Sequence, residues 1–275
     1  MKKIFLLSGF AALFLFSACK EKEVEIAHLG AGKRNVLVEE VTGVGCSNCP
    51  DGTRTLTSLQ SSFEAEGREL IVVSIHAAGN FSVPYPNSLY NFNTADGQAL
   101  ADYIGVLEGF PCAAIDRRLL ADETTTYLTP HTRWEGVIRS EFAKDYGLDL
   151  FLTNSFDPAT RQLSIRTDIA PGQTLSGENR LSIVITQDSI IDLQNDHNVF
   201  KPNYAHRHVL RDVVTNVEGD VIVEPLTSGV ILHKSYTVKL PAEWDETRCH
   251  VVAFVHHGGN PDKDVLQVVE KHVIE

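Results

Sequence analysis

The chain has 275 residues, of which 43% are apolar, and a formal net charge of −12 at pH 7. This acidity argues against nucleic acid as a partner and against electrostatic docking to anionic lipid, because both carry negative charge. The length and the apolar content predict two domains, each large enough to bury a hydrophobic core of its own.

The N-terminus carries the pattern of a bacterial lipoprotein signal peptide. Lys2 and Lys3 precede an apolar run over residues 4–16, and a small-residue ending leads directly to Cys19. This pattern resembles the lipobox, in which the cysteine thiol is diacylated and becomes the new N-terminus. A single transmembrane anchor is the alternative, although the run is shorter than the ~20 residues that span a bilayer. We expect a signal peptide at residues 1–18 and a membrane anchor, palmitate included, on Cys19.

A charged tether follows the lipidation site. Residues 19–31 begin with alternating lysine and glutamate after the cysteine, which is the composition of a flexible spacer. The same segment resembles the acidic export signal of surface lipoproteins in Bacteroidetes. We expect the lipid to anchor the protein in the outer membrane with the chain exposed on the cell surface; a periplasm-facing orientation is the alternative.

Two cysteines separated by two residues form the most informative motif. A strand-like run over 35–41 and a turn over 42–45 lead to Cys46, and an amphipathic helix is predicted over 51–66, after Cys49. The N–H groups at a helix start favour a thiolate, and the second thiol can then resolve a mixed disulfide. The pattern is typical of a redox site, which requires Cys46 exposed as the attacking thiol and Cys49 more buried as the resolving one. A structural disulfide in an oxidising compartment is the alternative.

The following segments place further residues beside that motif. Residues 70–75 form a nearly continuous apolar run, which predicts a buried strand parallel to the first one. His76 ends this strand, where it either tunes the Cys46 thiolate or makes ordinary hydrogen bonds. The irregular segment 77–93 is expected to form a loop over the site.

A proline-containing segment is expected to face the cysteine pair. A helix predicted over 94–104 is followed by Gly109, Phe110 and Pro111, and then by a small-residue strand that Cys112 opens. This order resembles the segment of thioredoxins that carries a cis-proline facing the Cys-x-x-Cys pair. The resemblance implies that Pro111 shapes the surface that receives a partner's disulfide. Cys112 either brings a third sulfur to the pair, for an alternative disulfide or a soft metal such as Cu(I) or Zn, or is a small core residue.

From residue 147 onward the pattern changes to strand after strand, following a last helix over 132–144. Apolar or alternating runs between turn signals predict about seven strands, and hence an immunoglobulin-like β-sandwich. The expected strands cover residues 148–153, 162–167, 181–186, 209–214, 235–240, 249–256 and 265–273. His206 and His208 would point to the same side of a strand as candidate ligands of a divalent metal; solvated or hydrogen-bonded histidines are the alternative.

The motifs together resemble one protein family. Residues 39–52 and 109–111 are similar to the Omp-twenty-eight-related outer-membrane lipoproteins of Bacteroidetes, and the lipobox at Cys19 strengthens the resemblance. The resemblance implies an α/β thioredoxin-like domain over residues 32–146, followed by an all-β sandwich domain over residues 147–275.

Two features depart from thioredoxins: no tryptophan precedes Cys46, and Cys112 follows the proline where threonine is common. The sequence predicts a lipid-anchored cell-envelope protein whose Cys-x-x-Cys site exchanges disulfides with protein thiols or disulfides. A non-catalytic surface binding or adhesion lipoprotein, with the thioredoxin-like domain as scaffold, is the alternative. No cofactor is expected. Other enzyme classes find little support, because phosphate-binding glycine loops, serine-nucleophile elbows and His-Glu-x-x-His motifs do not occur.

Overall fold

The computed structural model describes residues 33–259 and 262–274 of the chain. The expected signal peptide over 1–18, the lipidation site at Cys19 and the tether over 19–31 lie outside the described residues. Within them the protein is predominantly β with few helices. No helix in the described ranges is both long enough and apolar enough to cross a membrane.

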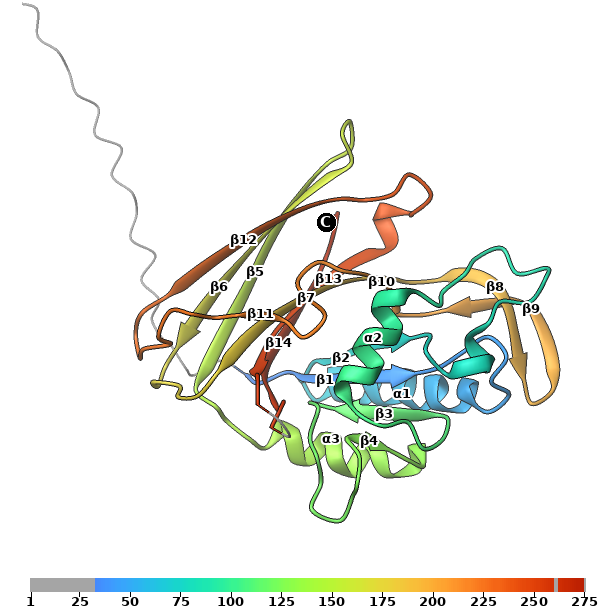
Figure 1. Ribbon diagram of the computed structural model, residues 1–275, viewed down its shortest axis with the longest axis horizontal. Helices are drawn as coiled ribbons and strands as arrows, with labels where there is room; N and C mark the ends of the chain where they lie inside the picture. Colours follow the sequence, from blue (N-terminus) through green and yellow to red (C-terminus); the bar gives the residue numbers. More distant parts are fainter. Residues whose placement is uncertain (1–32, 260–261, 275) are drawn as a thin grey trace, which may run out of the picture.

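The first part of the chain alternates strands and helices around a buried sheet (Figure 1). Its elements are β1 (Val36–Val41), α1 (Cys49–Ala65), β2 (Leu70–Ile75), α2 (Ala95–Ile104), β3 (Cys112–Ile115), β4 (Tyr127–Leu128) and α3 (Trp134–Phe142), with short 3-10 helices at Gly79–Ser82 and His131–Arg133. β1 pairs in parallel with β2 and antiparallel with β3. Every residue of β1 and β2 is buried, so the two predicted strands and their parallel pairing are confirmed.

Helices cover both faces of this part of the sheet. α1 and α3 pack on one face through residues such as Phe63 and Ile138. α2 packs on the other face through Leu100 and Ile104. Because neighbouring strand residues point to opposite faces, a strand covered on both sides needs a continuous apolar sequence, and β2 has one.

The second part of the chain forms two facing sheets. Its elements are β5 (Leu148–Asp157), β6 (Gln162–Pro171), β7 (Asn179–Gln187), β8 (Ile190–Asp196), β9 (Val199–His206), β10 (Val209–Val213), β11 (Asp220–Val221), β12 (Leu232–Lys239), β13 (Cys249–His257) and β14 (Val265–His272), with a 3-10 helix at Glu246–Arg248. β12, β6 and β5 form one sheet, whereas β7, β10, β13 and β14 belong to a larger one. Ile165 of β6, Ile183 of β7 and Val251 of β13 share the core between them.

The sequence does not predict β11 or the hairpin of β8 and β9. Most residues of β9 are exposed, so its segment lacks the apolar alternation that identifies a half-buried strand. Figure 1 shows this hairpin extending from the strands of the second part to the loop before α1 and the start of that helix. A hairpin whose apolar residues, such as Val199 and Phe200, are partly exposed is recognised only once its neighbours in space are known.

One sheet joins the two parts of the chain. Its strands follow the order β14-β13-β7-β10-β2-β1-β3-β4, and β11 pairs with β7 at its edge. The junction is the pairing of β10 with β2, where the Ser74 N–H donates to the His208 carbonyl oxygen at 2.8 Å. The division into domains over 32–146 and 147–275 stays a prediction, because the structure carries a continuous sheet across both segments.

Candidate functional site

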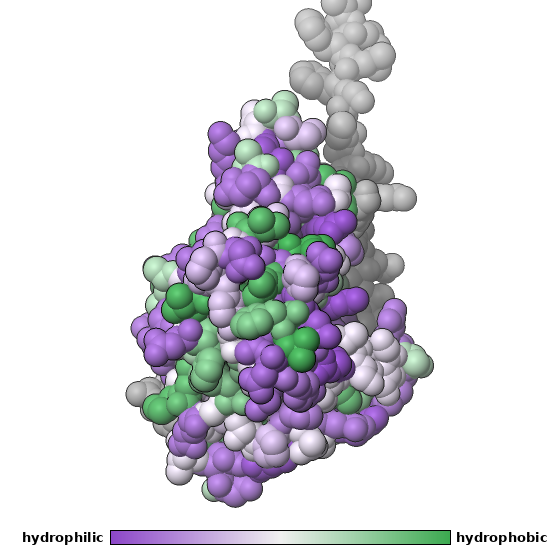
Figure 2. Space-filling model, turned by 90° about the vertical axis from the view of Figure 1, so that its right-hand side faces the viewer, coloured by the Kyte–Doolittle hydropathy of each residue, from purple (hydrophilic) through white to green (hydrophobic). Residues whose placement is uncertain are grey.

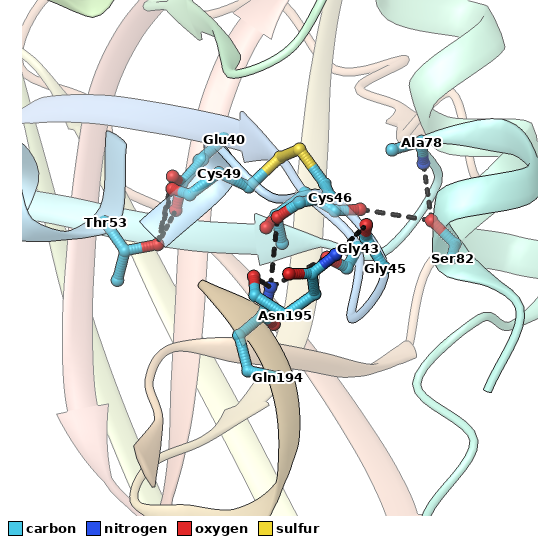
Figure 3. The surroundings of a disulfide bond; sticks show 11 residues. Glu40, Gly43, Gly45, Cys46, Cys49, Thr53, Ala78, Ser82, Gln194 and Asn195 are labelled. Atoms are coloured by element: carbon cyan, nitrogen blue, oxygen red, sulfur yellow. Dashed lines mark hydrogen bonds between the residues drawn. A yellow bond between two sulfur atoms is a disulfide. The ribbon is translucent and has the colours of Figure 1, made fainter. Parts of the chain in front are cut away.

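The two cysteines of the motif form a disulfide at the start of α1 (Figure 3). The sulfur atoms of Cys46 and Cys49 are 2.01 Å apart, and α1 begins at Cys49 with Pro50 in its first turn. A tight turn after β1 brings Cys46 to this place, because the Cys46 N–H donates to the Gly43 carbonyl oxygen at 3.0 Å. The pair therefore lies at a helix N-terminus, in its oxidised form.

Cys46 is buried, whereas the redox interpretation of the pair requires it to be exposed as the attacking thiol. The residue is 4% exposed, against 0% for Cys49. The loop after β2 provides part of the cover, since the Gly45 N–H donates to the Phe81 carbonyl oxygen at 2.8 Å. This loop packs so closely that a Cβ on Gly43 would lie 2.5 Å from the same oxygen. The expected loop over the site exists, and it restricts access to the first cysteine.

An open cleft still reaches Cys46. Its volume is about 370 Å³. The lining residues are Cys46, Ser47, Asn48, Phe81, Leu107, Glu108, Gly109 and Phe110. Figure 2 shows apolar residues gathered on the face that β8, β9 and the loop over 77–93 form, where Phe81 and Phe200 are 50% and 54% exposed. A partner with apolar side chains can therefore approach one of the two sulfur atoms.

Pro111 packs against the first turns of α1. The Phe110–Pro111 bond is cis, as the likeness to thioredoxins implied. A Cβ added to Gly52 would lie 2.9 Å from the Pro111 Cβ and 3.0 Å from the Trp134 Cη2, so there is room only for glycine. Pro111 and the disulfide thus both lie at the N-terminal end of α1.

Cys112 is a core residue in this structure. It is fully buried, opens β3 opposite Val41, and belongs to the apolar cluster that α2 covers. Burial raises the pKa of its thiol to about 12, with a smaller contribution from the charge of Glu40. Cys249 is also a buried free thiol. In the described part of the chain no three His, Cys, Asp or Glu side chains are arranged to hold a metal. Of the two alternatives for Cys112, its burial in the apolar cluster favours the small core residue.

Glu40 is a buried acid beside the disulfide that the sequence analysis missed. Thr53 and Ser74 donate hydroxyl hydrogen bonds to its carboxylate oxygens, each at 3.2 Å. The Thr53 hydroxyl also lies 3.5 Å from the Cys49 carbonyl oxygen, which links the acid to the cysteine pair (Figure 3). Burial raises the pKa of Glu40 from 4.5 to about 8. The signal in the sequence was a pair of glutamates, Glu39 and Glu40, inside a strand whose other residues are apolar.

The β8–β9 hairpin holds the loop that carries Cys46. The Gln194 side-chain amide donates to the carbonyl oxygens of Gly43 and Cys46, both at 3.2 Å. The backbone N–H groups of Asn195 and His197 donate to Val44 and Ser47 at 2.8 and 2.9 Å. The loop that carries Cys46 is thus held by a segment almost 150 residues away, and we call these four hydrogen bonds from Gln194, Asn195 and His197 the hairpin clamp.

The predicted histidines do not form the arrangement that the sequence suggested. His206 ends β9 and is buried, whereas His208 follows in a left-handed conformation with φ of 51°. The His208 ring instead contacts the Gln60 side chain at 3.1 Å and Asp188 at 3.5 Å. The expected shared strand face of His206 and His208 is therefore wrong, because the strand ends between them.

His76 meets His206 instead, with ring centroids 5.7 Å apart. Burial lowers the pKa of His76 well below its usual value and that of His206 to about 4. Both rings are therefore neutral near pH 7. A neutral His76 supplies no positive charge for a thiolate at Cys46, which weighs against the tuning role that the sequence allowed.

Comparison with known proteins supports the fold over most of the chain. No curated protein matches the sequence significantly. Among solved structures, HBP35 of Porphyromonas gingivalis is similar with a TM-score of 0.72 and 16% identity, over 89% of this chain and 76% of that chain. Protein AGR_C_4864 from Agrobacterium tumefaciens is similar with a TM-score of 0.54 and 12% identity, over 89% of this chain and 97% of that chain. At these identities the likeness concerns the fold alone.

A sequence family matches the greater part of the chain. Residues 97–275 match the family described as outer membrane protein Omp28. The match includes Pro111 and Cys112, while Cys46 and Cys49 lie on its N-terminal side. It confirms the resemblance that the motifs and the lipobox indicated. The chain belongs to the Omp28 family of outer membrane proteins.

Proposed function

We propose that this outer membrane protein is anchored by lipid on Cys19 and exchanges disulfides with thiols of other proteins at Cys46 and Cys49. The observation that carries the proposal is the position of the pair. Its disulfide lies at the start of α1, Cys46 lines a cleft of about 370 Å³, and the cis Phe110–Pro111 segment borders the same helix end.

The first part of the chain fits a thioredoxin-like arrangement. A parallel β1-α1-β2 unit, helices on both faces and a cis-proline against the helix that starts at Cys49 support this assignment. The two facing sheets of the second part are consistent with an immunoglobulin-like sandwich. The fold likeness to HBP35 extends across both parts.

The exchange takes place in two steps. A partner thiolate attacks the Cys46 sulfur, a mixed disulfide forms, and the electron pair of the broken bond leaves on Cys49. Glu40 holds a proton near pH 7 because its pKa is about 8, and it passes this proton to the Cys49 thiolate. A second thiolate of the partner then attacks the mixed disulfide and releases Cys46 as a thiolate near the N-terminus of α1. The partner dithiol is oxidised, and the cysteine pair is reduced.

The acidic tether after Cys19 supports exposure at the cell surface. On that side of the membrane the partners would be exported or host proteins with accessible cysteines. Membrane-impermeant thiol reagents applied to intact cells after mild reduction test the orientation. Labelling of Cys46 without permeabilisation is expected, and labelling only after permeabilisation would place the chain on the periplasmic side.

Substitution of the second cysteine tests the exchange directly. In Cys49→Ser, Cys46 has no internal partner, so we expect a stable mixed disulfide between Cys46 and glutathione after incubation with glutathione disulfide. The matched variant Cys46→Ser leaves only the fully buried Cys49 and should stay unmodified. Mass spectrometry of the intact chain distinguishes them, with the buried Cys112 and Cys249 present in both. Equal modification of the two variants would contradict the assigned roles.

A second candidate function is a binding scaffold in which the disulfide is structural. The 4% exposure of Cys46 and the hairpin clamp favour it. The two candidate functions, disulfide exchange and a binding scaffold, predict different effects of weakening the hairpin clamp on access to Cys46. Exchange requires that Cys46 becomes reachable when the clamp is weakened, whereas a scaffold function does not.

Weakening the clamp should accelerate reduction of the disulfide. Gln194→Ala removes two hydrogen bonds to the loop around Cys46, each worth about 1 kcal/mol. We therefore expect reduction by dithiothreitol to be roughly 5- to 30-fold faster than in the wild type. Gln173→Ala is the matched control. The Gln173 side-chain amide also donates to a backbone carbonyl oxygen, that of Tyr146, but in the segment just before β5 and away from the cysteine pair. An unchanged rate in Gln194→Ala would show that the clamp does not limit access.

A further inference from the structure

The cleft beside Cys46 has apolar walls. Phe81, Leu107 and Phe110 line it, and its volume is about 370 Å³. The rings of Phe81 and Phe110 meet edge to face, with centroids 6.2 Å apart. This volume is at the lower end of the range of about 300–1,000 Å³ for ligand pockets, so it accommodates a few side chains. The cleft therefore suits a short apolar stretch of polypeptide that carries a cysteine.

The segment before Pro111 leaves room for such a stretch. A Cβ added to Gly109 would meet nothing within 4 Å, so the segment faces open space at this position. Val106 is 71% exposed and adds apolar surface on this side, opposite the half-exposed Phe81. A partner chain can therefore lie over the cleft without displacing the proline.

The rim of the cleft is acidic. Glu108 is the charged member of the lining, and its side chain is exposed. The Thr124 hydroxyl donates to the Glu108 Oε1 at 3.2 Å, and no basic side chain in the described part of the chain forms an ion pair with this carboxylate. An unpaired acid at the edge of an apolar cleft attracts a cation and repels an anion.

Neighbouring segments add to the negative charge of the rim. The segment that contacts Glu108 contains Asp122 and Glu123, which share one arginine, Arg133. At the start of α1 two aspartates share one arginine in the same way (Asp51, Asp196 and Arg54). Each group keeps one negative charge in excess, so the surroundings of the cleft favour a basic partner.

We propose that the cleft selects partner segments in which apolar residues flank the cysteine and basic residues lie next to them, with Glu108 setting the charge preference. The inference rests on the proposed disulfide exchange and names the substrate class of that site. Apolar side chains of the partner contact Phe81 and Phe110, and the removal of this surface from water supplies affinity. The basic side chain lies at the wet rim, where an ion pair contributes to selectivity and to the rate of encounter.

Reaction of the Cys49→Ser variant with activated peptides tests the selection. The Cys46 thiolate attacks a peptide cysteine that is bonded to a thiopyridine group; the mixed disulfide forms, and thiopyridone leaves with the electron pair and is measured by absorbance. The peptides are Lys-Leu-Cys-Leu-Lys, Glu-Leu-Cys-Leu-Glu and Lys-Gly-Cys-Gly-Lys, and each rate is divided by the rate with mercaptoethanol. At low ionic strength we expect the first peptide to react about fivefold faster than the second and about tenfold faster than the third.

Charge reversal tests the role of Glu108. In the same Cys49→Ser background, Glu108→Lys should lower the preference for lysine over glutamate peptides by about threefold or more. Glu64→Lys is the matched control, because it makes the same change in net charge at an exposed position near the other end of α1. It should keep the preference. Equal preferences in the two variants, or no preference while Glu108 is present, would overturn the proposal.

Peptides with serine in place of cysteine separate the inference from the exchange itself. The wild-type chain, with its disulfide intact, is titrated with fluorescein-labelled Lys-Leu-Ser-Leu-Lys and with the glutamate counterpart, and binding is followed by anisotropy. We expect the lysine peptide to bind about fivefold more tightly, and Glu108→Lys to remove the difference. Selective binding without reaction at Cys46 would contradict the exchange and support the docking site. Reaction without selectivity would overturn the docking site and leave the exchange intact.

Discussion

Replacing Glu40 with glutamine is expected to remove a loss of stability that the wild type suffers as the pH rises from about 5 to about 8. Burial raises the pKa of Glu40 from 4.5 to about 8. In the unfolded chain this carboxyl releases its proton near pH 4.5, whereas the folded chain keeps it until about pH 8. Between these values the folded state binds more protons, so the free energy of unfolding falls as the pH rises. Each pKa unit corresponds to about 1.4 kcal/mol, so the loss is on the order of 4 kcal/mol.

Comparing the wild type with the Glu40→Gln variant isolates the contribution of Glu40 to the pH dependence of stability. Asp116 is another buried acid whose pKa is raised by burial, to about 7, and it produces a loss in the same direction in both proteins. Glutamine keeps the shape of the side chain, and an amide oxygen in the place of Oε2 can accept from both Thr53 and Ser74, whose hydroxyls lie 3.3 and 3.2 Å from that oxygen. Urea unfolding at several pH values should therefore give curves that diverge towards pH 8, with the variant more stable there. Parallel curves would contradict a protonated Glu40 beneath the disulfide.

Replacing Gly52 with alanine should have the second large effect. A Cβ at this position would lie 2.8 Å from the Glu40 Oε1, 2.9 Å from the Pro111 Cβ and 3.0 Å from the Trp134 Cη2. All three neighbours are buried, so α1 has to move away from the proline segment. Overpacking of this kind costs about 1–3 kcal/mol, which outweighs the gain in helix propensity of about 1 kcal/mol.

Gly136 provides a matched control in another helix. A Cβ added there meets nothing within 4 Å, so Gly136→Ala should stabilise the protein by about 1 kcal/mol through helix propensity alone. The free energies of unfolding of the two variants, measured in urea, should therefore change in opposite directions. A Gly52→Ala protein as stable as Gly136→Ala would show that Pro111 does not pack tightly against α1.

The buried strands and the cysteine motif could be predicted because their signals are local. The nearly continuous apolar run of β2 identifies a strand covered on both faces. The strand-like run of β1 and the turn before Cys46 lead into the helix at the expected place. The likeness to thioredoxins added the cis bond before Pro111, which no pattern in composition would give.

The details of the site depended on contacts between distant segments. Cys46 is covered in part by the hairpin of β8 and β9, from which Gln194, 148 residues later in the chain, contacts its carbonyl oxygen, and no sequence pattern identifies that hairpin. His76 and His206 meet only because β10 pairs with β2 and brings the end of β9 beside it. Single-sequence periodicity contains no information on such pairings, so the prediction joined His206 to its neighbour His208 instead.

The reduction potential of the Cys46–Cys49 disulfide tests the proposed exchange most directly. The protein is equilibrated with thiol–disulfide buffers of graded potential, and the reduced fraction is measured by alkylation of free thiols and mass spectrometry. Exchange predicts a single reversible transition between about −270 and −120 mV, the range of disulfide oxidoreductases. A potential below about −300 mV, which is typical of structural disulfides, would contradict exchange and favour the binding scaffold.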